Sequence, residues 1–363
     1  MKSFKRFYMC VIITSCIMFS ANVFAMGYLP ISTTPKKPVD ENTGNIPKKP
    51  VDENTGNIPE NIEYIPGQSY YGSAGDEENG KYIEYIPGNL PIILSSAHGG
   101  YLKPEAVKTR RYGSSDTDTY TQEMTRQIME DIYNETGCYP HVIINLLHRK
   151  KLDGNRDIGE AAQGDPLSKE AWYNFHAFID YAKKQAVSQY DHGLYIDVHG
   201  FPGWSNKVII GYRLTGANLR RSDDEINDEK YINKSTIKNL YQDNIQDLSF
   251  AEILRGNMSI GGLFDRLDNP IYESVPSPSK PYPKSGETYY GGVYNMKRHC
   301  IGKGNEKISG FQLELDKKIR TLETEGEQNK GEIARQNFSR ALKDILIKFF
   351  KIHHDIDLAT CYK

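Results

Sequence analysis

Short apolar runs alternate with longer amphipathic segments through most of the chain after residue 90. The apolar runs predict buried β-strands, and they cover residues 91–96, 141–147, 194–199, 207–211 and 310–315. Apolar residues spaced three and four apart predict helices over residues 119–135, 167–188 and 331–351. Because helices separate buried strands, the pattern favours an α/β layer architecture. The polar, proline-rich stretch from 214 to 298 predicts loops that wall a substrate cleft.

The first residues have the pattern of a secretory signal peptide. Lys2, Lys5 and Arg6 precede a short apolar core over residues 7–19, and small residues around Ala25 suit cleavage. We therefore expect residues 1–25 to be removed and the protein to be secreted. Later segments are too short or too polar to predict a membrane span.

A twelve-residue repeat follows the signal peptide. Residues 35–46 read PKKPVDENTGNI, and residues 47–58 repeat this sequence. The repeat has few large apolar residues, so it cannot bury enough surface to offset the entropy of ordering. We expect a disordered spacer over residues 26–80, a catalytic domain over 81–352 and a C-terminal tail over 353–363.

Composition narrows the function classes. The formal net charge is -2 and the basic residues are dispersed, which argues against nucleic acid or an anionic membrane as partner. Cys138, Cys300 and Cys361 follow the signal peptide, and we expect one disulfide and one free thiol with the pairing open. Asn-X-Ser/Thr sequons predict a glycoprotein if the host is a eukaryote, and they begin at Asn134, Asn233, Asn257 and Asn337.

Two predicted strands end in a histidine followed by glycine. These segments read SAHGG around His98 and YIDVHG around His199. Histidines at strand ends can converge at one edge of an α/β sheet, and neutral imidazole is a common zinc ligand. A hydrolytic zinc site needs a third protein ligand, for which Asp118, Asp116 and Glu105 are the candidates.

Two further segments carry candidate substrate and proton-transfer groups. The segment LHRKKLDGNRD follows a predicted strand and contains Arg149 and Arg156, whose planar guanidinium groups suit a carboxylate. Glu314 lies inside the predicted strand FQLEL, where a buried carboxylate is costly unless it is paired or used. Glu314 is therefore a candidate general base, and the alternative is a surface residue of an edge strand.

These segments together resemble a known family. SAHGG, SSDTDTYTQEM, LHRKKLDGNRDIGEA, YIDVHG and FQLELDKKIR occur in the order seen in the N-formylglutamate amidohydrolase family, over residues 92–320. The resemblance implies a core similar to zinc carboxypeptidases and aspartoacylases. Such a core is an α/β fold with a mixed, mostly parallel central sheet and helices on both faces.

The resemblance also implies residue roles. One Zn²⁺ per chain would be held by His98, Asp118 and His199. Glu314 would match the catalytic glutamate. The groups that bind the substrate carboxylate and polarise its carbonyl would be Arg149, Asn155 and Arg156.

We therefore expect a secreted zinc amidohydrolase or metallocarboxypeptidase-like enzyme. Its substrate would be a carboxylate-bearing amide, such as an N-acyl amino acid, a peptide C-terminus or a poly-glutamate-like polymer. A serine esterase is a weaker alternative, because the His-Gly-Gly segment suits an oxyanion loop but no G-x-S-x-G motif follows. A secreted binding protein that keeps the fold without activity is the alternative from another class.

Overall fold

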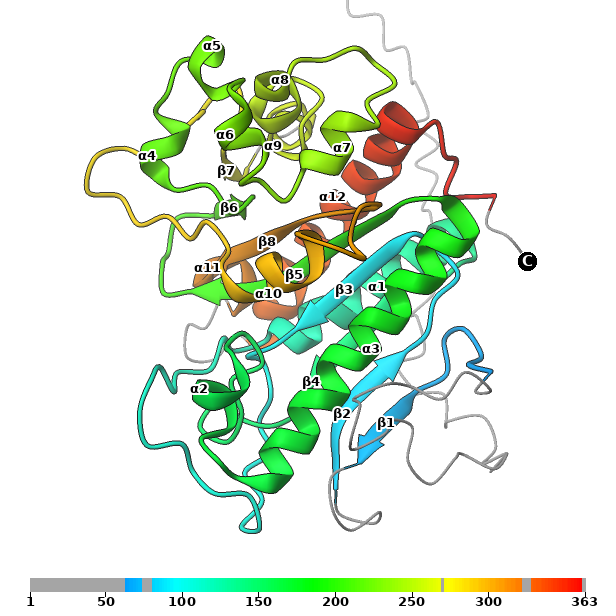
Figure 1. Cartoon of the computed structure of the whole chain (residues 1–363), viewed down its shortest axis with the longest axis vertical. Coiled ribbons are helices and arrows are strands. Elements are labelled where there is room, and N and C mark those ends of the chain that lie inside the picture. Colours follow the sequence, from blue (N-terminus) through cyan, green and yellow to red (C-terminus); the bar gives the residue numbers. More distant parts are fainter. Residues whose placement is uncertain (1–62, 74–79, 269–270, 322–327, 361–363) are drawn as a thin grey trace, which may run out of the picture. The chain divides into compact units, whose positions relative to one another are not determined.

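The computed structural model describes residues 63–73, 80–268, 271–321 and 328–360. Eight strands within these residues form one sheet in the order β1-β2-β4-β3-β5-β8-β6-β7 (Figure 1). The strands are β1 (Tyr70–Ser73), β2 (Lys81–Ile86), β3 (Ile92–Ser96), β4 (His141–Asn145), β5 (Gly193–Phe201), β6 (Lys207–Gly211), β7 (Glu273–Val275) and β8 (Ile308–Asp316).

The centre of the sheet is parallel. Strands β4, β3, β5 and β8 pair in parallel, while β2 joins β4 and β6 joins β8 in antiparallel fashion. The carboxyl ends of the central strands therefore meet at one edge, where α/β folds place their ligands.

Helices cover both faces of this sheet. Helices α1 (Thr121–Thr136) and α12 (Gln328–His354) lie against one face, and α3 (Pro166–Tyr190) and α10 (Tyr294–Cys300) lie against the other (Figure 1). Alternate residues of β3 enter different cores: Leu94 packs with the α1 side and Ile93 with the α3 side. Strands buried on both faces appear as continuous apolar runs, which is why their positions were predictable. The predicted mixed, mostly parallel α/β fold is confirmed.

Local signals set where the helices begin. Asp165 caps α3 by accepting a hydrogen bond from the backbone N–H of Ser168, and Pro166 occupies the first turn. Asp157 caps α2 (Ile158–Ala162) in the same way through the N–H groups of Gly159 and Glu160.

The segment from 214 to 298 is more regular than its composition predicts. It contains β7, most of α10 and the short helices α4 (Gly216–Leu219), α5 (Asp223–Ile226), α6 (Glu229–Ile232), α7 (Lys238–Gln242), α8 (Phe250–Arg255) and α9 (Ile260–Asp265). The helix α11 (Lys317–Arg320) follows β8. Thr215, Ser222 and Ser249 form capping boxes that start α4, α5 and α8. Helices of four to six residues are too short to show a periodic pattern, so the prediction of loops was wrong.

Both expected domain boundaries need correction. Strand β1 lies inside the stretch expected to be a spacer, and Tyr64 before it is buried against the rings of Tyr85 and Phe178. At the other end, α12 continues to His354, and Leu358 is buried in the core rather than placed in a free tail. Residues 1–25, which we expect to be a signal peptide, and the repeats at 35–58 lie outside the described residues.

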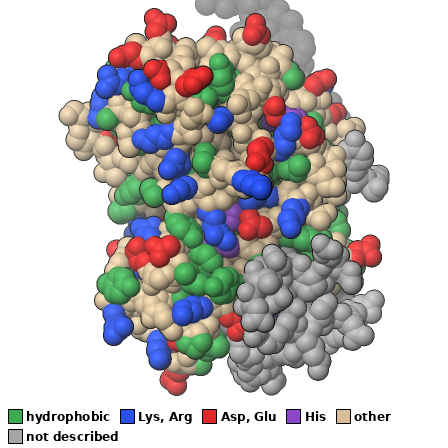
Figure 2. Space-filling view, viewed as in Figure 1, with side chains coloured by type: hydrophobic (Ala, Val, Ile, Leu, Met, Phe, Trp, Pro, Cys, Tyr) green, Lys and Arg blue, Asp and Glu red, His purple; other side chains and the backbone are tan. Residues whose placement is uncertain are grey.

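The three cysteines after residue 25 differ in their state. Cys138 is disulfide-bonded and Cys300 is a free, buried thiol, while Cys361 lies outside the described residues. Within the described part of the chain, no helix combines the length and apolarity needed to cross a membrane. Figure 2 shows Lys and Arg side chains interspersed with Asp and Glu over the face in view.

Candidate metal centre

Three buried side chains meet near the carboxyl ends of the central strands. His98 follows β3, His199 lies near the end of β5, and Asp118 lies in the loop before α1. Their ligating atoms all lie within 4.8 Å of one another. We call these three residues the metal triad. The other candidates for third ligand, Glu105 and Asp116, are exposed and lie outside the triad.

The two imidazoles face one carboxylate oxygen. The Nδ1 atoms of His98 and His199 lie 3.3 and 3.1 Å from Oδ2 of Asp118. The backbone of Asp118 is fixed by its N–H, which donates to the His98 carbonyl at 3.1 Å. Two imidazole nitrogens and one carboxylate oxygen form the donor set of many catalytic zinc sites, so the triad fits Zn²⁺.

Each imidazole is oriented from behind by a second carboxylate. The Nε2 atom of His98 lies 2.6 Å from Oδ1 of Asp153, and Nε2 of His199 lies 2.8 Å from Oδ2 of Asp197. A carboxylate on one ring nitrogen leaves the other nitrogen as the ligand atom, as in carboxylate–histidine–zinc arrangements. Sequence reasoning missed both aspartates. The spacing of Asp197 and His199 could have identified the first, because residues two apart share one face of a strand.

The electrostatics of the triad suit a cation. Burial opposes ionisation of Asp118, but hydrogen bonds with His199 and His98 hold the pKa of this carboxyl well below its ordinary value. Burial also opposes a charged His199, yet Asp197 and Asp118 raise its pKa well above the ordinary range. The carboxylates therefore favour positive charge at this position, and a metal ion competes with a proton for Nδ1 of His199.

Glu314 occupies the middle of the sheet rather than an edge. It lies on β8 directly opposite His199 on β5, and its side chain is buried. Burial raises the pKa of Glu314 to about 7, although His199 acts in the opposite direction. Gln312 donates a hydrogen bond to Oε1 of Glu314 at 2.7 Å. A carboxyl group that titrates near neutral pH is suited to general acid–base catalysis.

The predicted substrate-binding residues are placed unequally. Arg149 donates to Oδ2 of Asp153 at 2.9 Å and lies 3.8 Å from Oδ1 of Asp118. Nδ2 of Asn155 lies 3.3 Å from Nε2 of His199. Arg156 is farther out: its guanidinium is paired with Glu160 on α2 at 3.1 Å and is about one-third exposed. The structure thus places Arg149 and Asn155 next to the metal triad and Arg156 farther from it.

The glycine after His199 makes room for a buried arginine. Gly200 is extended, and a Cβ atom there would lie 2.2 Å from Cζ of Arg320. Arg320 is buried and donates to the carbonyl groups of Leu315, Phe201 and Thr119. The absence of a side chain at Gly200 therefore admits a buried guanidinium that ties three segments around the triad.

One tyrosine of the segment from 214 to 298 reaches the site. Tyr290 is partly exposed, and burial together with the carboxylates of Glu314 and Asp118 raises its pKa. Its ring lies 6.0 Å from that of Phe201 at the end of β5. Tyr290 therefore lies near the carboxylates of the site, and the expectation that the whole segment walls a substrate cleft stays a prediction.

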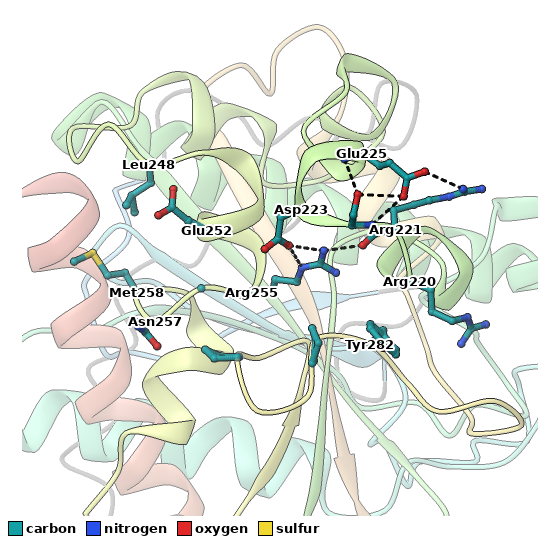
Figure 3. A pocket seen from close by; sticks show the side chains of 14 residues that line it. Arg220, Arg221, Asp223, Glu225, Leu248, Glu252, Arg255, Asn257, Met258 and Tyr282 are labelled. Carbon is teal, nitrogen blue, oxygen red and sulfur yellow. Dashed lines mark hydrogen bonds and ion pairs between the residues drawn. The ribbon is translucent and has the colours of Figure 1, made fainter.

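A cavity of about 900 Å³ lies elsewhere, among α5, α8 and the loop that contains Tyr282 (Figure 3). None of the triad residues lines it. Four of its charged groups pair with one another: Arg255 binds Asp223 through two nitrogens at 2.9 and 2.6 Å, and Arg221 pairs with Glu225. Its size alone therefore does not make it the site of chemistry.

Comparisons with known proteins give a likeness of fold only. No family model and no curated protein matches the sequence. Among solved structures, N-formylglutamate amidohydrolase from Ralstonia eutropha is 12% identical, with 74% of this chain and 98% of that chain covered and a TM-score of 0.43. A bacteriophage poly-gamma-glutamate hydrolase is 12% identical, with 78% and 93% covered and a TM-score of 0.28.

A metallo-carboxypeptidase from Pseudomonas aeruginosa is also 12% identical, with 78% of this chain and 66% of that chain covered and a TM-score of 0.32. The first of these structures is of the family that the sequence motifs resemble. At such identities and scores, the chemistry of the site has to be argued from the side chains of this chain.

Proposed function

We propose that this protein is a zinc-dependent amidohydrolase that cleaves an amide bond in a carboxylate-bearing substrate. One observation carries the proposal. Two imidazole Nδ1 atoms converge on one Asp118 oxygen, each ring is oriented by its own carboxylate, and a buried Glu314 with a pKa of about 7 lies beside them.

The residues divide the work as follows. Zinc, when bound by the triad, supplies Lewis-acid activation of a water molecule and of the scissile carbonyl. Glu314 accepts a proton from the attacking water and returns it to the leaving amine nitrogen. The products are a carboxylic acid and an amine, so the reaction needs no co-reactant besides water. Arg149 and Nδ2 of Asn155 offer N–H donors to oxygen atoms of the substrate.

The N–H donors near the triad support a substrate that carries a carboxylate. Two N–H donors lie beside the triad: Arg149 is 3.8 Å from Asp118, and Nδ2 of Asn155 is 3.3 Å from Nε2 of His199. Arg156 lies farther out and donates to the carbonyl of Asn155. We include N-acyl amino acids, peptide C-termini and poly-glutamate-like polymers in this class. Secretion, proposed from the N-terminal segment, favours an extracellular peptide or polymer over a cytoplasmic metabolite.

The test combines metal analysis with one substitution. We expect about one zinc per chain and hydrolysis of at least one member of a panel of N-acyl amino acids and C-terminal peptides. Glu314→Gln should keep the zinc and lower kcat about 100-fold or more, the usual contribution of a general base.

Glu84→Gln is the matched control. Glu84 is also a buried glutamate of the sheet, where it pairs with Arg126 of α1. It lies on β2, which is separated from β8 by strands β4, β3 and β5. Its substitution should leave kcat unchanged. Zinc-free wild type, or an unaltered rate in Glu314→Gln, would contradict the proposal. Stoichiometric zinc without hydrolysis of any substrate would favour a binding protein instead.

A further inference from the structure

Asn295 is a buried amide that contacts the surroundings of the metal triad in two ways. It lies in the first turn of α10, on the opposite side of His199 from Asp118. Its side chain reaches the carboxylate behind His199, and its backbone N–H reaches Asn155. We propose that Asn295 is a positioning residue that orients both the ligand His199 and the base Glu314. This inference rests on the proposed function.

The side-chain contact fixes Asp197. Nδ2 of Asn295 donates to Oδ2 of Asp197 at 2.9 Å, the same oxygen that Nε2 of His199 contacts at 2.8 Å. Ser95 donates to the other oxygen at 2.5 Å. With three contacts, the Asp197 carboxylate has one orientation, and it holds the imidazole of His199 with Nδ1 toward Asp118.

The amide oxygen of Asn295 is evidence against a purely structural role for this residue. Oδ1 of Asn295 is buried and has no hydrogen-bond partner among the described residues. A buried acceptor without a partner costs stability, on the order of 1–3 kcal/mol. An apolar side chain of similar shape would avoid this cost, so the gain from an amide at this position lies in its contact with Asp197.

The backbone contact sets the direction of a second chain of hydrogen bonds. The N–H of Asn295 can only donate, and it donates to Oδ1 of Asn155 at 2.9 Å. The amide of Asn155 must then turn its Nδ2 toward Oε1 of Gln312, at 3.5 Å, the weakest link of the chain. Gln312 in turn presents Nε2 to Oε1 of Glu314 at 2.7 Å. One carboxylate oxygen of Glu314 is thereby held, which leaves the other for proton transfer.

The start of α10 explains why this N–H is available. The first turn of a helix has N–H groups without partners inside the helix. Val293, at the N-cap position, provides no side-chain cap. Gly292 precedes it with a φ of 81°, and a Cβ atom there would lie 2.7 Å from Cγ of Met296. This turn places the free N–H of Asn295 against Asn155.

The two chains of hydrogen bonds can be separated by substitution. Asn295→Leu removes the contact with Asp197 and keeps the backbone N–H. Partners of metal-binding histidines typically contribute about 10- to 100-fold to metal affinity, and Asn295 acts one bond farther out, so we expect the zinc dissociation constant to rise about tenfold. The d–d absorption spectrum of the cobalt-substituted protein should change as well. Asn295→Ala serves as a second variant if the leucine side chain prevents folding.

Gln312→Met should have the opposite effect: it should lower kcat without changing zinc affinity. It leaves Asp197 untouched, so zinc affinity and the cobalt spectrum should match wild type. The kcat of the zinc-saturated enzyme should fall about three- to tenfold with KM nearly unchanged, the effect expected from one hydrogen bond to the base.

Asn305→Leu is the matched control. Asn305 is also buried, and its Nδ2 donates to the carbonyl groups of Arg298 and Ile301 at the other end of α10. This variant should lower the melting temperature without altering zinc affinity or the cobalt spectrum. The inference is overturned if Asn295→Leu or Asn295→Ala binds zinc with wild-type affinity, or if Asn305→Leu weakens zinc equally. Zinc-free wild type would instead refute the proposed function.

Discussion

Replacing Asp153 with Asn tests whether the carboxylate behind His98 supports metal binding. Asp153 is fully buried, and its Oδ1 atom contacts Nε2 of His98 at 2.6 Å and the N–H of Asn155 at 3.0 Å. Its Oδ2 atom accepts from Nε of Arg149 at 2.9 Å. Asn keeps the shape and one acceptor oxygen but removes the negative charge.

Two estimates of the effect on zinc agree. A hydrogen bond to a charged group contributes about 1.5–3 kcal/mol and a neutral one about 0.5–1.5, so the His98 contact weakens by about 1–1.5 kcal/mol. Loss of a carboxylate partner of a metal-binding histidine typically lowers metal affinity about 10- to 100-fold, or about 1.4–2.7 kcal/mol. We therefore expect the zinc dissociation constant of Asp153→Asn to rise at least about tenfold.

Stability has to be measured separately from metal affinity. Arg149 loses its nearest counter-charge in Asp153→Asn, although Asp118 remains 3.8 Å away. Melting temperature should therefore fall as well. Zinc affinity is measured by competition with a chromophoric chelator, at a temperature where circular dichroism shows both proteins to be folded.

Asp157→Asn is the control in the same segment. Asp157 caps α2, is exposed and does not contact the metal triad. Its substitution should leave zinc affinity unchanged. A dissociation constant for Asp153→Asn within twofold of wild type would refute the role that we assign to this carboxylate.

Three further predictions concern the substrate, acid stability and the N-terminal boundary. Arg156→Lys should lower kcat/KM about ten- to a hundredfold for substrates with a free carboxylate and hardly affect their esters, because Lys lacks the planar fork; equal wild-type rates on acid and ester would contradict this. Burial lowers the pKa of His141 from 6.5 to about 3. Between these two pH values the unfolded chain binds a proton at this residue and the folded protein does not, so the free energy of unfolding decreases as pH falls from 6.5 toward 3. His141→Gln should reduce the slope of unfolding free energy against pH by at most about 1.4 kcal/mol per unit in that window, and an unchanged slope would exclude His141 as the source. Deletion through residue 80 removes β1 and the buried Tyr64, so it should lower the melting temperature, whereas deletion through residue 62 should not; equal melting temperatures would contradict the corrected boundary.

How far the fold could be predicted depends on how each strand is covered. Strands β3, β4, β5, β6 and β8 are buried along their length and appear in the sequence as apolar runs. Strand β2 was missed because it reads KYIEYI, in which Glu84 interrupts the apolar residues. Glu84 is nevertheless buried, where it pairs with Arg126 of α1. Such a charge can be placed in a strand only when its partner is known from the fold.

The repeated hexapeptide IEYIPG shows the same limit more directly. The copy at 83–88 supplies most of β2, whereas the described part of the copy at 62–67 forms no strand. The two copies contact each other, because the N–H of Gly67 donates to the carbonyl of Pro87 and the rings of Tyr64 and Tyr85 lie 5.3 Å apart. Identical sequence thus takes different structures according to its neighbours, since strand preference depends mainly on packing.

The candidate site divides in the same way. His98 and His199 could be predicted because each lies at the end of an apolar run. Glu314 could be predicted because a carboxylate buried within such a run is costly unless it is paired or has a function. Asp153 and Asn295 could not be predicted in this way. The first lies in a loop and the second in a seven-residue helix, and each meets its histidine environment only after the fold has formed.

The roles of the buried carboxylates follow from which histidine nitrogen they contact. Asp153 and Asp197 contact Nε2 atoms, and their remaining oxygens accept from Arg149 and from Ser95, so they are held as orienting groups. Asp118 contacts both Nδ1 atoms and therefore shares with them the position of a metal ion. Glu314 contacts neither ring in this network, and its raised pKa reflects burial rather than an ion pair. A carboxylate that keeps its proton affinity near neutrality can transfer protons, whereas Asp118, with its lowered pKa, is suited to hold a cation.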